Sequence, residues 1–62
     1  MIVEDICKLV PDRQRIVIED AISTKWLYEG INKKVTNEVL KKRVLCVVSF
    51  NTTLILQVAE VK

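Results

Sequence analysis

The fold of this chain is decided by residues 44–59, which read VLCVVSFNTTLILQVA. Two apolar runs rich in β-branched residues, Val44 to Phe50 and Thr53 to Ala59, flank the polar pair Asn51-Thr52. β-Branched residues favour strands, and asparagine tolerates the left-handed backbone conformation that a two-residue hairpin turn usually requires. The stretch therefore predicts an antiparallel β-hairpin.

A second hairpin is predicted in the first half of the chain. Arg15 to Glu19 contains three consecutive β-branched residues, and Lys25 to Glu29 has the character of a returning strand. The polar-edged connection Asp20 to Thr24 has a length that suits an antiparallel hairpin. Gly30, with its permissive backbone, ends the second strand.

A short helix is predicted before each hairpin. The first has apolar residues at one-face helical spacing and is closed by Pro11, which pushes the preceding residue out of helical geometry. The second is capped by Asn32 or Thr36 and ends at Lys41-Lys42-Arg43. The predicted buried residues are Ile2, Ile6, Leu9 and Val10 in the first helix, and Ile31, Val35, Val39 and Leu40 in the second.

The order helix, two strands, helix, two strands indicates an α+β fold. A chain of 62 residues has room for one small domain, so we expect residues 1–62 to form two short helices packed on a four-stranded, mainly antiparallel sheet. Half of the residues are apolar, and the strands are apolar on both faces, whereas two short helices can cover only one. We therefore expect a homo-oligomer that buries a second apolar face formed by Val17, Leu27, Leu45, Val47 and Ile55.

Composition argues against catalysis and against metal binding. The chain has no histidine and a single glycine, so a Cys–His or Ser–His nucleophile pair, a zinc site and a glycine-rich phosphate loop are all excluded. The acidic pairs Glu4/Asp5 and Glu19/Asp20 are adjacent in sequence, and neighbours on a strand point to opposite faces. The sequence predicts a protein that is not an enzyme and that carries neither a cofactor nor a metal.

The compartment is predicted from the cysteines and from the absence of a targeting signal. Cys7 and Cys46 lie in apolar patterns, which favours two buried thiols in a reducing cytosol; the alternative is a Cys7–Cys46 disulfide. The chain starts with acidic rather than basic residues, and its longest apolar run, Val44 to Val48, is too short to span a membrane. We expect a cytoplasmic protein without a membrane partner.

Two features are candidates for binding. The net charge of +2 is small, but the segment around the second helix carries five cations, Lys33, Lys34, Lys41, Lys42 and Arg43. This basic set would dock phosphates or an acidic protein surface; the alternative is a solvated helix end. Trp26 and Tyr28 are two apart on one strand, so their rings would leave the same face and could stack on a base, or else serve packing.

The order of these motifs resembles short, mostly uncharacterised proteins of phages and prophages of Gram-positive bacteria. The shared features are Pro11-Asp12, the Ile16-Val17-Ile18 strand, the string Leu27-Tyr28-Glu29-Gly30, and the later helix and strands. Those proteins often show Ile-Pro near the second helix, where this chain has Val35-Thr36. The resemblance implies a phage context, in which proteins of this size are often regulators or inhibitors of host defence. It supplies no catalytic residues.

Taken together, these features favour a non-enzymatic, phage-type accessory protein that inhibits a host protein, for instance a defence component, by direct docking. Two alternatives remain open. One is an oligomeric binder that captures nucleic acid or a small signalling nucleotide between subunits. The other is a structural subunit of a phage assembly.

Overall fold

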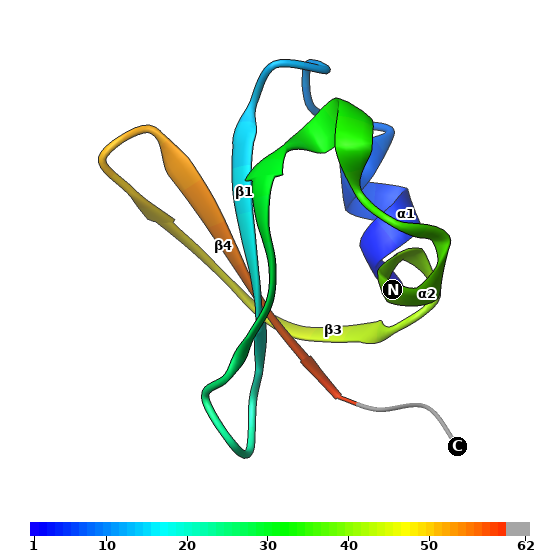
Figure 1. Cartoon of the computed structure of the whole chain (residues 1–62), viewed down its shortest axis with the longest axis vertical. Coiled ribbons are helices and arrows are strands. Elements are labelled where there is room, and N and C mark those ends of the chain that lie inside the picture. The colour runs from blue at the N-terminus through cyan, green and yellow to red at the C-terminus, as the bar shows by residue number, and fades with distance from the viewer. Residues whose placement is uncertain (60–62) are drawn as a thin grey trace.

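A computed structural model describes residues 1–59 of the chain. Its elements follow the order α1 (Val3–Cys7), β1 (Arg15–Asp20), β2 (Trp26–Ile31), the 3₁₀ turn η1 (Asn32–Lys34), α2 (Asn37–Leu40), β3 (Arg43–Phe50) and β4 (Thr53–Ala59) (Figure 1). The predicted α+β class, the element order and the positions of both hairpins are confirmed, except that β2 does not end at Gly30 and continues to Ile31.

The sheet is mixed rather than mainly antiparallel, which corrects one detail of the prediction. The strand order is β2-β1-β4-β3, and the two central strands, β1 and β4, run parallel. Since β2 and β3 are each antiparallel to a central strand, the two edge strands also run in the same direction. A connection between two such strands must cross over the sheet, and η1 and α2 supply that crossover.

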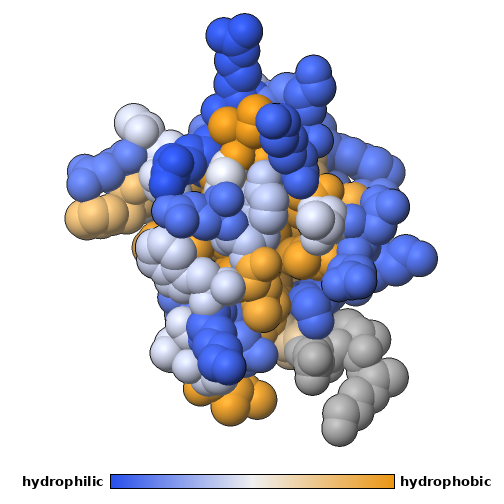
Figure 2. Space-filling model, viewed as in Figure 1, coloured by the Kyte–Doolittle hydropathy of each residue, from blue (hydrophilic) through white to orange (hydrophobic). Residues whose placement is uncertain are grey.

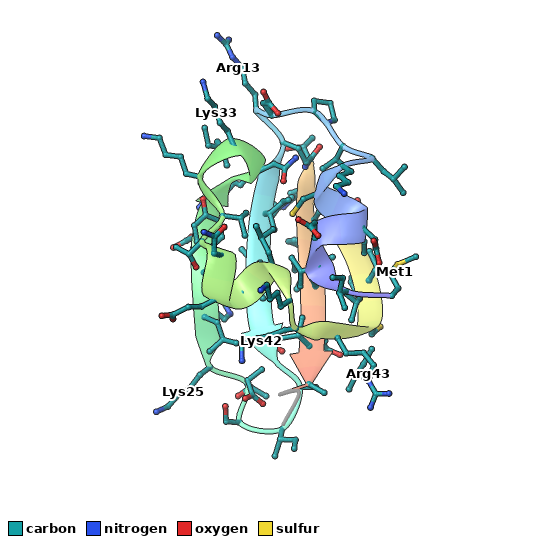
Figure 3. The ribbon with its side chains drawn as sticks, turned by 90° about the vertical axis from the view of Figure 1, so that its right-hand side faces the viewer. Met1, Arg13, Lys25, Lys33, Lys42 and Arg43 are labelled. Atoms are coloured by element: carbon teal, nitrogen blue, oxygen red, sulfur yellow. The ribbon has the colours of Figure 1, made fainter. Side chains whose placement is uncertain are left out.

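Both helices lie on one face of the sheet and form the core with it. Figure 3 shows α1 and α2 in front of the four strands, so that the opposite face is left without a covering helix. The side chains that form the buried core come from the central strands and from both helices: Val3, Ile6, Ile16, Ile18, Val39, Leu56 and Val58. We call the side of the sheet that holds this core the helix face and the other side the open face.

Each edge strand contains a β-bulge, which alternating hydrophobicity does not reveal. In β2, Tyr28 pairs with Ile18 and Trp26 pairs with Glu19, so Leu27 is an extra residue. In β3, Val44 pairs with Val58 and Cys46 with Gln57, so Leu45 is extra. An inserted residue reverses which face the rest of the strand presents, and bulges are common at sheet edges.

Asn32 explains why α1 is shorter than the apolar spacing predicts. Its buried side-chain amide donates hydrogen bonds to the carbonyl oxygens of Cys7, Val10 and Pro11, at 2.8, 3.1 and 3.3 Å. These carbonyls belong to the last residue of α1 and to the segment that follows it. Leu9 therefore leaves the helical face and is exposed, although the pattern predicts it to be buried.

The string Leu27-Tyr28-Glu29-Gly30 has a structural role at each position. Leu27 forms the bulge, and the Glu29 carboxylate accepts a 2.6 Å hydrogen bond from the Arg15 guanidinium. The Tyr28 ring lies over Gly30, where a Cβ atom would come within 2.8 Å of the tyrosine hydroxyl oxygen. That hydroxyl donates a 2.6 Å hydrogen bond to the carbonyl oxygen of Ile31. The side-chain-free glycine thus provides the space that Tyr28 occupies.

Candidate binding surface

The open face of the sheet carries an apolar strip that no helix covers. Val17 and Ile55 are register partners on the parallel central strands, and Val48 on β3 pairs with Ile55. Partners across a ladder share a face, so these three side chains form a row across the sheet. Val17 is only 4% exposed although no helix lies above it, which shows that neighbouring side chains of the open face enclose it.

Side chains of the open face, Val17 and Ile55 among them, line a hollow with a volume of about 380 Å³. Val17 and Ile55, from the central strands, contribute apolar lining, and Trp26 from β2 and Phe50 from β3 bring an aromatic ring from each edge strand. Trp26 is 58% and Phe50 64% exposed, so most of each ring is available to a partner. Figure 2 shows apolar side chains reaching the surface near the β3–β4 turn, where Phe50 lies.

Polar groups border the hollow on one side. The Arg15–Glu29 ion pair joins β1 to β2, with 2.6 Å between Nη2 and Oε2. Asn51 and Thr53 complete the polar lining near the second hairpin turn. The charges of Arg15 and Glu29 compensate each other, so an uncharged, apolar group fits the centre of the hollow better than an ion does.

The predicted oligomer face is brought together only in part. Val17 and Ile55 lie side by side on the open face, as the pattern indicates. Leu27 and Leu45 are the two bulge residues, and Val47 pairs with Leu56, which places it on the helix face. The bulge at Leu45 changes the face on which the following side chains of β3 lie. Cys46, Val48 and Phe50, which strict alternation would place on the same face as Val44 in the core, therefore lie on the open face.

The predicted stacking pair is separated. The bulge at Leu27 places Trp26 on the open face beside Glu19, whereas Tyr28 pairs with Ile18 and packs against the core. The two rings therefore leave opposite faces, and the assumption that they share one is wrong. Tyr28 has a packing role, and Trp26 remains as an exposed aromatic side chain in the hollow.

The five predicted cations do not form one continuous patch. Lys33 and Lys34 belong to η1, and the Lys33 N–H donates a 3.0 Å hydrogen bond to the carbonyl oxygen of Asp12. Figure 3 shows Lys33 near Arg13 at one end of the molecule, with Lys42 and Arg43 toward the other end. Lys41 follows α2, and the half-buried Lys42 lies close enough to Asp20 to help lower the pKa of that carboxyl.

The two cysteines occupy different environments, and both are free thiols. Cys7 is partly buried beside the core, and burial, with a smaller effect of the Glu4 carboxylate, raises the pKa of its thiol. Cys46 is exposed on the open face because of the bulge that precedes it. The prediction that both thiols are buried is therefore wrong for Cys46.

Within residues 1–59, no group of three or more acidic or cysteine side chains comes together in a way that could hold a metal ion. None of the helices in that part of the chain has the length and apolar character needed to cross a membrane. No known protein family, curated protein or solved structure matches this chain. The hollow on the open face, with the exposed Trp26 and Phe50 in its lining, is the strongest candidate for a functional site in the described part of the chain.

Proposed function

We propose that this chain is a non-enzymatic binding protein that docks on a partner protein through the hollow of the open face. One observation carries the proposal: two largely exposed aromatic rings, Trp26 and Phe50, project from opposite edge strands beside an apolar lining that includes Val17 and Ile55. Exposed aromatic side chains around an apolar centre with a polar border are typical of the residues that dominate protein–protein binding energy.

The hollow has the size of a pocket for one or two side chains of the partner. Its volume of about 380 Å³ lies at the lower end of the range for ligand sites. Because the bordering ion pair is internally neutralised, the matching segment of the partner is apolar or aromatic. The resemblance to phage and prophage proteins extends the proposal: the partner is a host protein, for instance a defence component, that the chain inhibits by docking.

The alternative, capture of nucleic acid or a small nucleotide, has weaker support. It relies on paired stacking rings, but Trp26 and Tyr28 lie on opposite faces of the sheet. It also relies on a continuous basic patch, but Lys33 lies far from Lys42 and Arg43 (Figure 3). One exposed ring, Trp26, remains able to stack on a base.

Trp26 is the single tryptophan of the chain, so its fluorescence reports directly on the hollow. A tagged chain is used to recover partners from a lysate of a Gram-positive bacterium, and each recovered protein is purified and titrated against the untagged chain. We expect a shift in Trp26 emission on binding and, for Trp26→Ala, a loss of about tenfold or more in affinity measured by calorimetry. Ile22→Ala is the matched control, because Ile22 is an exposed apolar residue in the β1–β2 turn, outside the hollow.

Parallel titrations with single-stranded oligonucleotides and with nucleotides test the alternative. A purified partner that binds Trp26→Ala as tightly as the wild type contradicts docking through the hollow. The alternative is favoured instead if a nucleotide changes Trp26 emission saturably and none of the purified partner proteins does.

A further inference from the structure

The outer edge of β3 is a second surface that could bind a partner, because part of its backbone is not paired with another strand. β3 lies at one end of the strand order, and from Leu45 to Phe50 no described strand pairs with its outer side. Only its beginning is covered: Ile2 forms a bridge with Arg43, and the Val44 N–H donates a 2.9 Å hydrogen bond to the carbonyl oxygen of Met1. An uncovered strand edge presents a row of free N–H and C=O groups that can pair with another strand.

The register identifies which backbone groups of β3 face outward. Phe50 and Thr53 close the two-residue turn and so form a hydrogen-bonded pair, after which hydrogen-bonded and non-hydrogen-bonded pairs alternate. The backbone groups of Ser49 and Val47 therefore point away from β4. The bulge makes Val44, rather than Leu45, the next residue in the ladder after Cys46. Its N–H points outward to the carbonyl oxygen of Met1, as the alternation predicts.

The side chains along this edge suit a second copy of the same strand. Leu45 is 56%, Val47 46% and Val48 44% exposed, and no charged residue occurs between Val44 and Ala59. Natural sheets protect exposed edges with charges or prolines, and this stretch has neither. The other edge strand, β2, differs because it carries Glu29 in an ion pair. Two β3 edges can thus approach each other without repulsion between like charges.

We propose that a second copy of this chain pairs with β3 antiparallel about a two-fold axis, through the backbone groups of Val47 and Ser49, to form a continuous eight-stranded sheet. The proposal keeps the homo-oligomer that the apolar composition indicates but places the contact at the strand edge rather than on the open face. Such an axis is perpendicular to the sheet, so both open faces point to the same side and both Trp26 side chains stay available for a partner. It goes beyond the proposed function and does not depend on it.

Amide hydrogen exchange of the wild-type chain tests the edge directly. With NMR detection at rising protein concentration, we expect the amides of Val47 and Ser49 to gain protection in step with a dimer mass measured by light scattering. The amide of Val48, which pairs with Ile55 inside the monomer, is the internal control and should stay protected at all concentrations. A chain that remains monomeric at submillimolar concentration, or a dimer in which Val47 and Ser49 exchange as fast as in the monomer, overturns the proposal.

Charge variants test self-pairing separately from other partners. Val47→Lys combined with Ser49→Lys places like charges opposite each other across the two-fold axis, as does the corresponding double change to glutamate. Each double variant alone should dimerise about tenfold or more weakly, whereas an equimolar mixture of the two should regain dimerisation. The control, Ile22→Lys, adds a charge at an exposed apolar position far from β3 in the sequence and should dimerise like the wild type.

The proposal is overturned if the equimolar mixture of the two double variants stays monomeric although each variant keeps the circular dichroism spectrum of the folded chain. It is also overturned if the double lysine variant alone dimerises like the wild type. Trp26→Ala separates the two proposals, because it should weaken docking of a partner and leave dimerisation unchanged. A loss of dimerisation in Trp26→Ala would place the self-contact on the open face and contradict pairing through β3.

Discussion

The side-chain amide of Asn32 donates a hydrogen bond of 2.8 Å to the carbonyl oxygen of Cys7, 25 residues earlier in the chain. This contact joins the end of α1 to the start of the crossover that carries the chain from β2 to β3. The Asn32 backbone N–H adds a 2.8 Å hydrogen bond to the carbonyl oxygen of Gln14, at the entrance to β1. One asparagine therefore holds together the N-terminal segment, the first strand and the crossover.

Replacing Asn32 should destabilise the whole fold. Asn32 is 7% exposed, and Asn32→Ala would leave the carbonyl oxygens of Cys7, Val10 and Pro11 without their side-chain donor. We expect the free energy of unfolding to fall by about 1–3 kcal/mol, measured by urea denaturation. The control is Asn37→Ala, at an exposed position of α2, which should change it by less than about 0.5 kcal/mol. Equal effects of the two variants would contradict the bridging role.

Thr52→Gly should stabilise the second hairpin. Asn51 and Thr52 both have positive φ angles, 47° and 62°, as a type I′ turn requires, and a β-branched residue is strained there. Glycine removes that strain, although its greater flexibility in the unfolded chain offsets part of the gain. We expect the free energy of unfolding, measured by thermal denaturation, to rise by about 0.5–1 kcal/mol. Thr53→Gly, one residue later in β4, should instead destabilise. A loss of stability in Thr52→Gly would show that the Thr52 side chain contributes more than the strain it introduces.

The two thiols should differ in reactivity. Cys46 is exposed, whereas partial burial of Cys7 raises the pKa of its thiol and lowers the thiolate fraction at neutral pH. In the native chain, a thiol reagent at pH 7.5 should label Cys46 rapidly and Cys7 slowly, and denaturation should remove the difference. Mass spectrometry with Cys46→Ser and Cys7→Ser separates the two rates. Faster native labelling of Cys7 than of Cys46 would contradict the placement of both residues.

The β1–β2 turn should give a measurable pH dependence. The Asp20 carboxylate accepts hydrogen bonds from the Ile22 and Ser23 N–H groups, at 2.8 and 3.1 Å, and these bonds lower its pKa, with a smaller contribution from Lys42. Because the folded-state pKa is the lower one, the stabilisation is present above the ordinary pKa of about 4 and is lost as the pH falls through the folded-state value. We expect Asp20→Asn to be less stable than the wild type at pH 7, and the difference in the free energy of unfolding to shrink as the pH falls below about 4. Asp12→Asn, at an exposed position, is the control. If the stability difference between Asp20→Asn and the wild type does not change with pH, the Asp20 charge has no role in stabilising the turn.

Local sequence patterns were sufficient to predict the elements and their order. The runs of β-branched residues locate β1, β3 and β4, and Asn51-Thr52 occupies the turn because asparagine accepts a left-handed conformation. These signals act between residues close in the chain, so they can be read without knowledge of the fold. The absence of histidine and the single glycine likewise restrict the available chemistry from composition alone.

Only the tertiary structure decided which side chains share a face. Leu27 and Leu45 continue the apolar patterns of their strands, and nothing in those patterns marks them as bulges. A bulge exists because the partner strand has one residue fewer in the ladder, so it becomes visible only in the pairing of the two strands of each hairpin. It separates Trp26 from Tyr28 and turns Cys46, Val48 and Phe50 to the open face, where the candidate site lies. The sequence by itself determined the strands; the pairing between them determined the site, because one inserted residue reverses the face of every residue that follows it.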